Sequence, residues 1–393
     1  MRSNDFVNLF FLFCSLASSA AAVTASVDFQ GVGIAPGYSS SEAIGISANG
    51  QVVVGRNRDS TGLQSQAFRW TVDSGMDDLN GVPGAPSSSY AVAASADGSL
   101  IIGDVQNPGE NRRGFRWTSA GGMVLMEATE SITPRSAVDI TPDGKFIVGS
   151  GQTPAFVNGS TTNESYYWTS SSSTTSLGDL FGDIVLSGAA GVSADGSVIA
   201  GFATDSNGTQ AYRWTSSTGM VSLGDLPGSP FRSFANDVSD DGSTIVGRGN
   251  VASGSSQAFR WTSQTGMVGL GNLPGGRRSE AHGVTHDGST IVGGSDLGAF
   301  IWTAEIGMVR LYDYLLTRGA MGLDSWILDE ALAITPNGRT IVGRGRNPLG
   351  QTEGFVVTII PEPTTLMFAM LGLASVTLGW TRNRRWVAAT LDW

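Results

Sequence analysis

The sequence predicts an all-β protein: a seven-bladed β-propeller closed by an N-terminal strand, with a single transmembrane helix at the C-terminus. Two features that recur along the chain predict the propeller. A hairpin dipeptide recurs at steps of 46 to 52 residues, and an aromatic strand follows it each time. A third observation predicts the helix: an uncharged apolar stretch, Thr364–Trp380, follows a proline triplet near the end of the chain.

The clearest copy of the repeat is Phe234–Gly276, which contains four short apolar runs separated by turn residues. The runs are Ala235–Val238, Thr244–Val246, Gln257–Thr262 and Met267–Leu273. Asp241-Gly242 joins the first two, since its turn needs a positive φ that glycine supplies. One copy is therefore expected to form a four-stranded antiparallel meander.

The copies can be counted in two independent ways, and both counts give seven. The dipeptides are Asn49-Gly50, Asp97-Gly98, Asp143-Gly144, Asp195-Gly196, Asp241-Gly242, Asp287-Gly288 and Asn337-Gly338. The third run ends near Trp70, Trp117, Trp168, Trp214, Trp261 and Trp302, with Val357 in the seventh place. A four-stranded unit of about 40–50 residues is typical of propeller blades, because such a sheet buries both faces only when neighbours stack on it.

The seventh copy supplies three strands, because Ala331–Ile360 ends at Pro361-Glu362-Pro363. Its missing fourth strand is expected at the other end of the propeller. Asp28–Val32 precedes Pro36-Gly37, just as Leu223–Leu226 precedes Pro227-Gly228. We therefore expect Asp28–Gly33 to pair beside Gly354–Ile359, which would join the termini and leave no open edge.

The segment Leu311–Ala331 departs from the repeat. It lacks the alternation of a strand, and Leu311, Leu315 and Leu316 have helical spacing. We expect a short helix on a loop leaving the sixth blade, packed as a cap.

The composition is that of a globular β protein, with 40% hydrophobic and 15% charged residues. The net charge of −11 gives no basic face for nucleic acid. The first residues resemble a signal peptide: Arg2, an apolar stretch Phe6–Leu16, and small residues that permit cleavage after Ala22 or after Ala25. The only cysteine, Cys14, lies inside it, so the mature chain is expected to contain no disulfide.

No catalytic or metal-binding motif is found, and we expect no cofactor. His282 and His286 are the only histidines and are interpreted as surface residues. The Asp-Gly pairs, and Asp205–Gly208, lack the spacing of a calcium loop and are interpreted as turns. Lone acids such as Asp237 and Asp240 cannot be paired from the sequence.

Four arginines recur between an aromatic residue and tryptophan in the third strand: Arg69, Arg116, Arg213 and Arg260. A structural role is expected for them, with carboxylates or several carbonyls close to Arg213 and Arg260. Asp179 and Asp225 are the candidate partners. The neighbouring Phe68, Phe115, Phe259 and Phe300 are expected in the core.

Thr364–Trp380 would span about 26 Å as a helix, just short of a bilayer core. Arg382, Arg384 and Arg385 follow at once, and the positive-inside tendency places them in the cytoplasm and the repeats outside. The expected organisation is a signal peptide at 1–25, a propeller at 26–360, a sorting and membrane segment at 361–385, and a short tail at 386–393.

Two resemblances follow from these residues. Pro361, Glu362 and Pro363, the apolar stretch and the arginine cluster resemble the PEP-CTERM sorting signal of secreted bacterial proteins. This resemblance implies recognition by an exosortase, cleavage near the triplet, and release or attachment at the cell surface, often beside exopolysaccharide. Over about Ala43–Ile360, the repeats resemble the extracellular HAF family, whose tripeptide is seen here as Gln66-Ala67-Phe68 and Gln257-Ala258-Phe259. That family brings no known activity.

The leading functional hypothesis is a secreted or cell-surface, non-enzymatic propeller that binds glycans or proteins of the extracellular matrix. The first alternative is a secreted propeller enzyme, such as a polysaccharide lyase or a glycosidase; the second is a matrix protein with no defined ligand. His, Tyr and Arg side chains around the channel would favour the enzyme, and a smooth Ser/Gly rim would favour binding.

Overall fold

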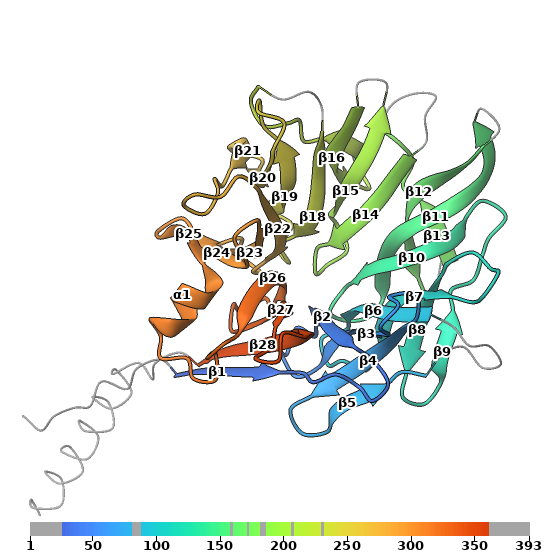
Figure 1. Ribbon diagram of the computed structural model, residues 1–393. Coiled ribbons are helices and arrows are strands. Elements are labelled where there is room, and N and C mark those ends of the chain that lie inside the picture. The colour runs from blue at the N-terminus through green and yellow to red at the C-terminus, as the bar shows by residue number, and fades with distance from the viewer. Residues whose placement is uncertain are drawn as a thin grey trace, which may run out of the picture. The chain divides into compact units, whose positions relative to one another are not determined.

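The described part of the chain is all-β apart from one short helix, and its strands form antiparallel sheets (Figure 1). The computed structural model describes residues 26–80, 88–157, 160–170, 173–180, 186–205, 208–228 and 232–360. Within these ranges, Val27–Ile359 forms one compact unit. No helix in the described part has the length and apolar composition that crossing a membrane requires. The predicted signal peptide, Thr364–Trp380 and the flanking sorting residues lie outside the described residues.

The described strands fall into sets of four, numbered here 1 to 7. Three sets are separate sheets, whereas one residue pair joins sets 3 and 4 (Asn163 and Leu186) and one joins sets 6 and 7 (Gly294 and Glu330). Set 1 is β2 (Ser40–Ile46), β3 (Val53–Arg58), β4 (Ser65–Thr71) and β5 (Gly75–Asp78). Set 2 is β6 (Ser88–Ala94), β7 (Ile101–Gln106), β8 (Arg113–Thr118) and β9 (Gly122–Leu125). Set 3 is β10 (Thr133–Ile140), β11 (Phe146–Val157), β12 (Ser160–Thr169) and β13 (Ser173–Ser176). Set 4 is β14 (Leu186–Val192), β15 (Ile199–Asp205), β16 (Gly208–Thr215) and β17 (Gly219–Ser222).

Set 5 is β18 (Ser233–Val238), β19 (Thr244–Asn250), β20 (Ser256–Thr262) and β21 (Gly266–Gly269). Set 6 is β22 (Ser279–Val284), β23 (Thr290–Ser295), β24 (Phe300–Thr303) and β25 (Gly307–Arg310). Set 7 combines β26 (Ile327–Ile334), β27 (Thr340–Arg346) and β28 (Thr352–Ile360) with β1 (Ser26–Gly31) from the other end of the chain. The only helix among the described residues is α1 (Leu311–Leu316). The fourth strand is shorter than predicted, since β21 ends at Gly269 rather than at Leu273.

In each set, hydrogen bonds of a Ser or Thr hydroxyl and an Asp or Asn side chain hold the hairpin between the first two strands. Set 5 is an example. The Ser239 hydroxyl donates to Asp241 Oδ1 at 2.5 Å, and the same oxygen accepts the Ser243 N–H at 2.9 Å. Gly242 closes the turn at φ 68°. Equivalent hydroxyl-to-Asp/Asn bonds occur at Ser47, Ser95, Thr141, Ser193, Thr285 and Thr335. Hydrogen bonds from Ser99 and Ser95 lower the pKa of Asp97 to about 2. The interpretation of these dipeptides as hairpin turns is confirmed.

The sets pack on one another through the third-strand aromatic residue. Phe68, Phe115, Phe259 and Phe300 are fully buried, as predicted, and Tyr166, Tyr212 and Phe355 fill the equivalent places. A serine hydroxyl also accepts a third-strand N–H from the preceding set at several junctions. The donor N–H groups and the acceptor hydroxyls are those of Ala67 and Ser89, Ser165 and Ser187, Ala211 and Ser233, and Ala258 and Ser279.

The last set is joined to the first in the same way. The Gly354 N–H in set 7 donates to the Ser41 hydroxyl in set 1 at 3.1 Å. In Figure 1 the red strands of set 7 accordingly lie beside the blue strands of set 1. A chain of four-stranded sheets that packs back on its own first member is a β-propeller.

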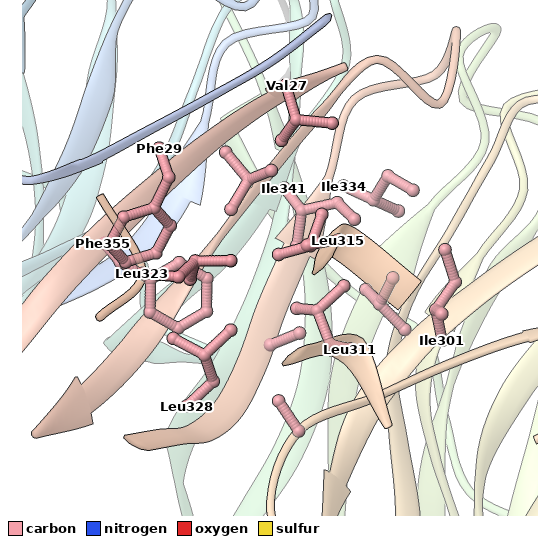
Figure 2. Close-up of a cluster of buried hydrophobic side chains, with 14 residues drawn as sticks. Val27, Phe29, Ile301, Leu311, Leu315, Leu323, Leu328, Ile334, Ile341 and Phe355 are labelled. Atoms are coloured by element: carbon pink, nitrogen blue, oxygen red, sulfur yellow. The ribbon is translucent and has the colours of Figure 1, made fainter. Parts of the chain in front are cut away.

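The N-terminal strand pairs with the last strand, as predicted. β1 lies next to β28, and the Val32 N–H donates to the Gly354 carbonyl at 2.9 Å. Val27 and Phe29 enter the core shown in Figure 2, whereas Asp28 between them is exposed. The Phe29 ring lies 5.1 Å from that of Trp326 and 6.0 Å from that of Phe355.

The predicted helix is present as α1, which follows set 6 directly. Leu311 and Leu315 are fully buried in the same core as Phe29, together with Leu323 and Leu328 (Figure 2). The helix is therefore a packed cap over the junction of sets 6 and 7, as the leucine spacing predicted.

Candidate functional site

A β-bulge occurs at the same place in all seven first strands. In set 1, Ala43 pairs with Gly55 and Gly45 pairs with Val54, which leaves Ile44 unpaired between them. A bulge adds one residue to one strand and redirects its side chain. The seven bulge residues are Ile44, Val92, Val138, Ala190, Asn236, His282 and Leu332.

These seven bulge residues line one cavity of about 380 Å³ between the first strands, which we call the channel. Five of them are aliphatic, and only the neighbouring Asn236 and His282 are polar. This ring was not predicted from the sequence. A signal was available, because each bulge residue follows an alanine of the repeat, and Asn236 and His282 interrupt an otherwise aliphatic position.

Three carboxylates line the channel, those of Asp139, Asp237 and Asp240, and the first two are engaged by backbone N–H groups. Asp139 accepts the N–H of Ile140 at 2.8 Å and, from the next set, the N–H of Val192 at 2.8 Å. Asp237 repeats this arrangement with Val238 at 2.8 Å and Val284 at 2.9 Å. Each of these two carboxylates therefore joins the first strands of two neighbouring sets.

Burial raises the pKa of Asp139 to about 7, despite the N–H groups that favour its charged form. Burial and the charge of Asp139 both raise the pKa of Asp237 well above its ordinary value. At the channel mouth, burial raises the pKa of Asp240, although His286 Nδ1 lies 3.5 Å from its Oδ2.

The two histidines have different surroundings, so the surface interpretation holds only for His286, which is exposed. His282 is half-buried in the channel, and burial lowers its pKa even though Glu280 and Glu330 oppose that change. Among the described residues, no group of three or more His, Cys, Asp or Glu side chains could hold a metal ion.

A second ring of residues lies two positions before the bulge residues. At this position, one residue of each first strand pairs with one residue of the second strand. In chain order the pairs are Glu42–Arg56, Tyr90–Asp104, Ser136–Ser150, Gly188–Phe202, Phe234–Arg248, Glu280–Gly294 and Glu330–Arg344. Sets 3 and 4 contribute small, neutral or aromatic residues, whereas sets 5, 6, 7, 1 and 2 contribute nearly all of the charges.

The charged part of this ring, which we call the ion-pair arc, is continuous across the junction of sets 7 and 1. The Glu42 carboxylate forms ion pairs with the guanidinium groups of Arg56 at 2.7 Å and Arg344 at 3.1 Å. The Arg344 guanidinium also pairs with the Glu330 carboxylate at 3.1 Å. Arg248 lies 3.2 Å from Glu280, whose Oε1 accepts from the bulge residue Asn236 at 2.9 Å. The arc therefore reaches the polar part of the channel.

The sequence offered two alternatives for the rim of the channel, and the structure contains a part of each. Tyr90, His282 and the arginines of the ion-pair arc lie along five sets, as expected for an enzyme. Sets 3 and 4 carry the smooth rim expected for a binding protein, where Ser136 and Ser150 share a hydroxyl hydrogen bond of 2.8 Å. Asp237 and Asp240 both line the channel, which their separate positions in the sequence did not reveal.

Three of the four recurrent arginines, Arg69, Arg116 and Arg260, make structural contacts, but none of them pairs with the predicted Asp179 or Asp225. Arg260 donates to the Gly288 carbonyl of the next set at 3.3 Å and to the Thr244 hydroxyl at 3.2 Å. The Arg116 guanidinium lies 4.3 Å from the centre of the Trp168 ring in the next set, and Arg69 lies 3.7 Å from Asp77. Arg213 is half-buried and has no hydrogen-bond partner among the described residues.

Neither proposed carboxylate pairs with these arginines in the described part of the chain. Asp179 is exposed, and Asp225 accepts the Arg232 N–H at 2.9 Å. Arg116 instead stacks on the tryptophan of the next set, and Arg260 donates to one turn carbonyl of the next set, where a carboxylate or several carbonyls were predicted.

The raised pKa of Asp139 gives a prediction for stability. An acid whose folded pKa lies above its unfolded value of about 3.9 stabilises the protein at low pH, and this contribution is lost as the pH rises through about 7. Asp139→Asn cannot ionise, so its stability should fall less than that of the wild type between about pH 5 and pH 8, by roughly 2–3 kcal/mol. Denaturant unfolding at both pH values measures the difference. Asp28→Asn, at an exposed position, is the control, and an unchanged pH dependence in Asp139→Asn would contradict the assignment.

No protein-family model matches this chain, and no curated protein matches it. Among solved structures, an oligogalacturonate lyase in complex with manganese is similar to it with a TM-score of 0.55 and 13% identity, over 88% of this chain and 96% of that chain. The β-propeller domain of the trilobed protease from Pyrococcus furiosus gives a TM-score of 0.49 and 8% identity, over 83% of this chain and 99% of that domain. TolB from Acinetobacter baumannii gives a TM-score of 0.44 and 13% identity. The match covers 80% of this chain and 66% of the TolB chain. At these identities the likeness concerns the fold alone.

Proposed function

We propose that the protein is a seven-bladed β-propeller of the cell surface that binds glycans or proteins of the extracellular matrix without chemically changing them. The seven four-stranded sets are its blades, and β1 completes the seventh. A propeller closed in this way offers a rigid surface that needs no disulfide, which suits a mature chain without cysteine.

The observation that carries this proposal is the state of the channel carboxylates. General acid–base catalysis needs a carboxyl group free to exchange a proton with the substrate. Asp139 and Asp237 instead use their oxygens to accept backbone N–H groups of two neighbouring blades. Glu42 and Glu330 are likewise occupied by arginines. Asp240, at the channel mouth, lies 3.5 Å from the exposed His286 instead. Four of these five acids therefore serve the scaffold, so binding is the function that the site supports best.

A secreted polysaccharide lyase or glycosidase is the second candidate. The observation that favours it is His282, whose half-buried ring lines the channel and has no hydrogen-bond partner among the described residues. Tyr90 and Arg344 belong to the second ring. Tyrosine and histidine are groups that can donate or accept a proton during catalysis.

Delivery to the surface is part of the proposal. The leader at 1–25 would direct export, and the arginines Arg382, Arg384 and Arg385 would hold the precursor in the inner membrane with the propeller outside. An exosortase-type enzyme would then cut near Pro361, Glu362 and Pro363. These steps rest on the resemblance of the C-terminal residues to the PEP-CTERM signal.

A glycan array probed with the purified protein tests the function. We expect saturable binding to a subset of surface polysaccharides, which a heat-unfolded sample loses. Pull-down with matrix proteins forms the second arm. The absence of binding to both glycans and matrix proteins would contradict the proposal.

A further inference from the structure

A groove of about 220 Å³ lies between sets 1 and 2, at the end of the ion-pair arc. The residues that matter here are Arg56, Arg58, Tyr90, Asp104, Gln106 and Arg112. Three guanidinium groups therefore face one carboxylate in this groove. Glu42 also lies beside Arg56 and Arg58, so three guanidinium groups meet two carboxylates and leave an excess of one positive charge, on a protein of net charge −11.

The groove is held rigidly from within. The Tyr90 hydroxyl donates to Asp104 Oδ2 at 2.5 Å and accepts from Arg112 Nη1 at 2.8 Å. The guanidinium groups of Arg56 and Arg112 each lie 5.3 Å from the centre of the Tyr90 ring. Asp104 is almost fully buried, and its other oxygen accepts the Ala137 N–H at 3.0 Å. The positions of Arg56 and Arg112 are thus set before any ligand arrives.

Two of the three arginines keep donors for a ligand. Arg56 is committed to Glu42, to which its Nε donates at 2.8 Å. The Arg58 side chain is 36% exposed, and its Nε lies 4.0 Å from Glu42, beyond hydrogen-bond length. The Arg112 side chain is 51% exposed and uses Nη1 for Tyr90, although guanidinium offers five N–H donors.

We propose that this groove binds a carboxylate-bearing sugar unit of an acidic polysaccharide, with Arg58 and Arg112 taking the carboxylate. This inference rests on the proposed function and names its ligand class. Guanidinium binds carboxylate through paired hydrogen bonds, which gives both strength and orientation.

The neutral groups of the groove favour a sugar over an acidic peptide. Gln106 uses its amide N–H for the Glu110 carbonyl at 3.3 Å, which leaves its side-chain oxygen to accept from a hydroxyl. Ser65 and Ser88 also line the groove, and their hydroxyls share a hydrogen bond of 2.8 Å. A sugar acid presents hydroxyls beside its carboxylate, whereas a glutamate or aspartate side chain does not. The volume is below the roughly 300 Å³ at which pockets for drug-sized ligands begin, so it suits one sugar unit.

The test is titration calorimetry of the full-length protein with alginate oligosaccharides, which carry one carboxylate per sugar unit. We expect wild-type binding to weaken as salt increases, because the ligand charge is screened. The double variant Arg58→Gln/Arg112→Gln should bind at least tenfold more weakly. Arg277→Gln/Arg278→Gln removes the same charge from an exposed loop and should bind like the wild type. Arg58→Gln alone breaks no hydrogen bond to the described residues and should weaken binding severalfold, which guards against misfolding of the double variant.

Several outcomes would overturn the assignment, and they separate it from the proposed function. Wild-type alginate binding that the double variant retains would place the ligand elsewhere and leave the proposed function intact. Binding to other glycans or proteins but not to alginate would reject the groove alone. Poly-glutamate binding that depends equally on Arg58 and Arg112 would reject the sugar. The absence of any glycan or protein ligand would reject both.

Discussion

Replacing Phe29 by alanine should lower the free energy of unfolding by about 3–5 kcal/mol, the range for deleting a buried aromatic side chain. Phe29 lies on the N-terminal strand, but its ring packs on Trp326 and Phe355, more than 290 residues away in the sequence. The loss should therefore weaken set 7 and the junction that this strand completes. Denaturant unfolding followed by tryptophan fluorescence measures the change.

The matched control for this variant is Asp28→Ala, one residue away on the same strand. Asp28 is exposed, so its replacement should change stability by no more than about 0.5 kcal/mol. Equal stability of the Phe29 and Asp28 variants would mean that β1 is not part of the last sheet.

Replacing Glu42 by glutamine should have the second large effect, a loss of about 3–5 kcal/mol. The Glu42 side chain is only 7% exposed and accepts from Arg56 and Arg344, which belong to the first and last sets. Burial alone would raise the pKa of Glu42, but these arginines and Arg58 bring it below its ordinary value. Its contribution is therefore present above the unfolded pKa of about 4.3 and is lost as the pH falls through the lower folded pKa.

Glu280→Gln is the control, since Glu280 is 32% exposed and pairs with one arginine, Arg248. Partly exposed pairs contribute about 1 kcal/mol or less. Unfolding at neutral pH compares the two variants. If Glu42→Gln costs no more than Glu280→Gln, the ion pairs at Glu42 do not hold the first and last sets together.

Much of the fold could be predicted because its signals are local. Gly242 must adopt a positive φ, and the Asp241 side chain caps the same turn, so a dipeptide identifies a hairpin. The third-strand position of Phe259 predicts burial through the alternation of the strand. Leu311 and Leu315 revealed a helix through their spacing. The absence of a fourth strand in the last copy predicted the role of β1.

The site depends on relations that no short stretch encodes. The bulge at His282 exists because β22 and β23 shift register by one residue, and this shift is a property of the pair of strands. Glu42 and Arg344 meet across 302 residues of sequence, because the last set packs on the first. Arg116 was expected to need a carboxylate, yet it stacks on Trp168 of the neighbouring set. Such contacts follow from stacking of whole sheets.

Binding without chemical change is the central claim, and incubation of the protein with the acidic oligosaccharide that it binds tests this most directly. The oligosaccharide is recovered after prolonged incubation, and its chain length is measured by mass spectrometry beside a sample without protein. We predict saturable binding and an oligosaccharide of unchanged length. Shorter products that accumulate with time, and that disappear when His282 is replaced by alanine, would contradict the claim and establish the protein as an enzyme.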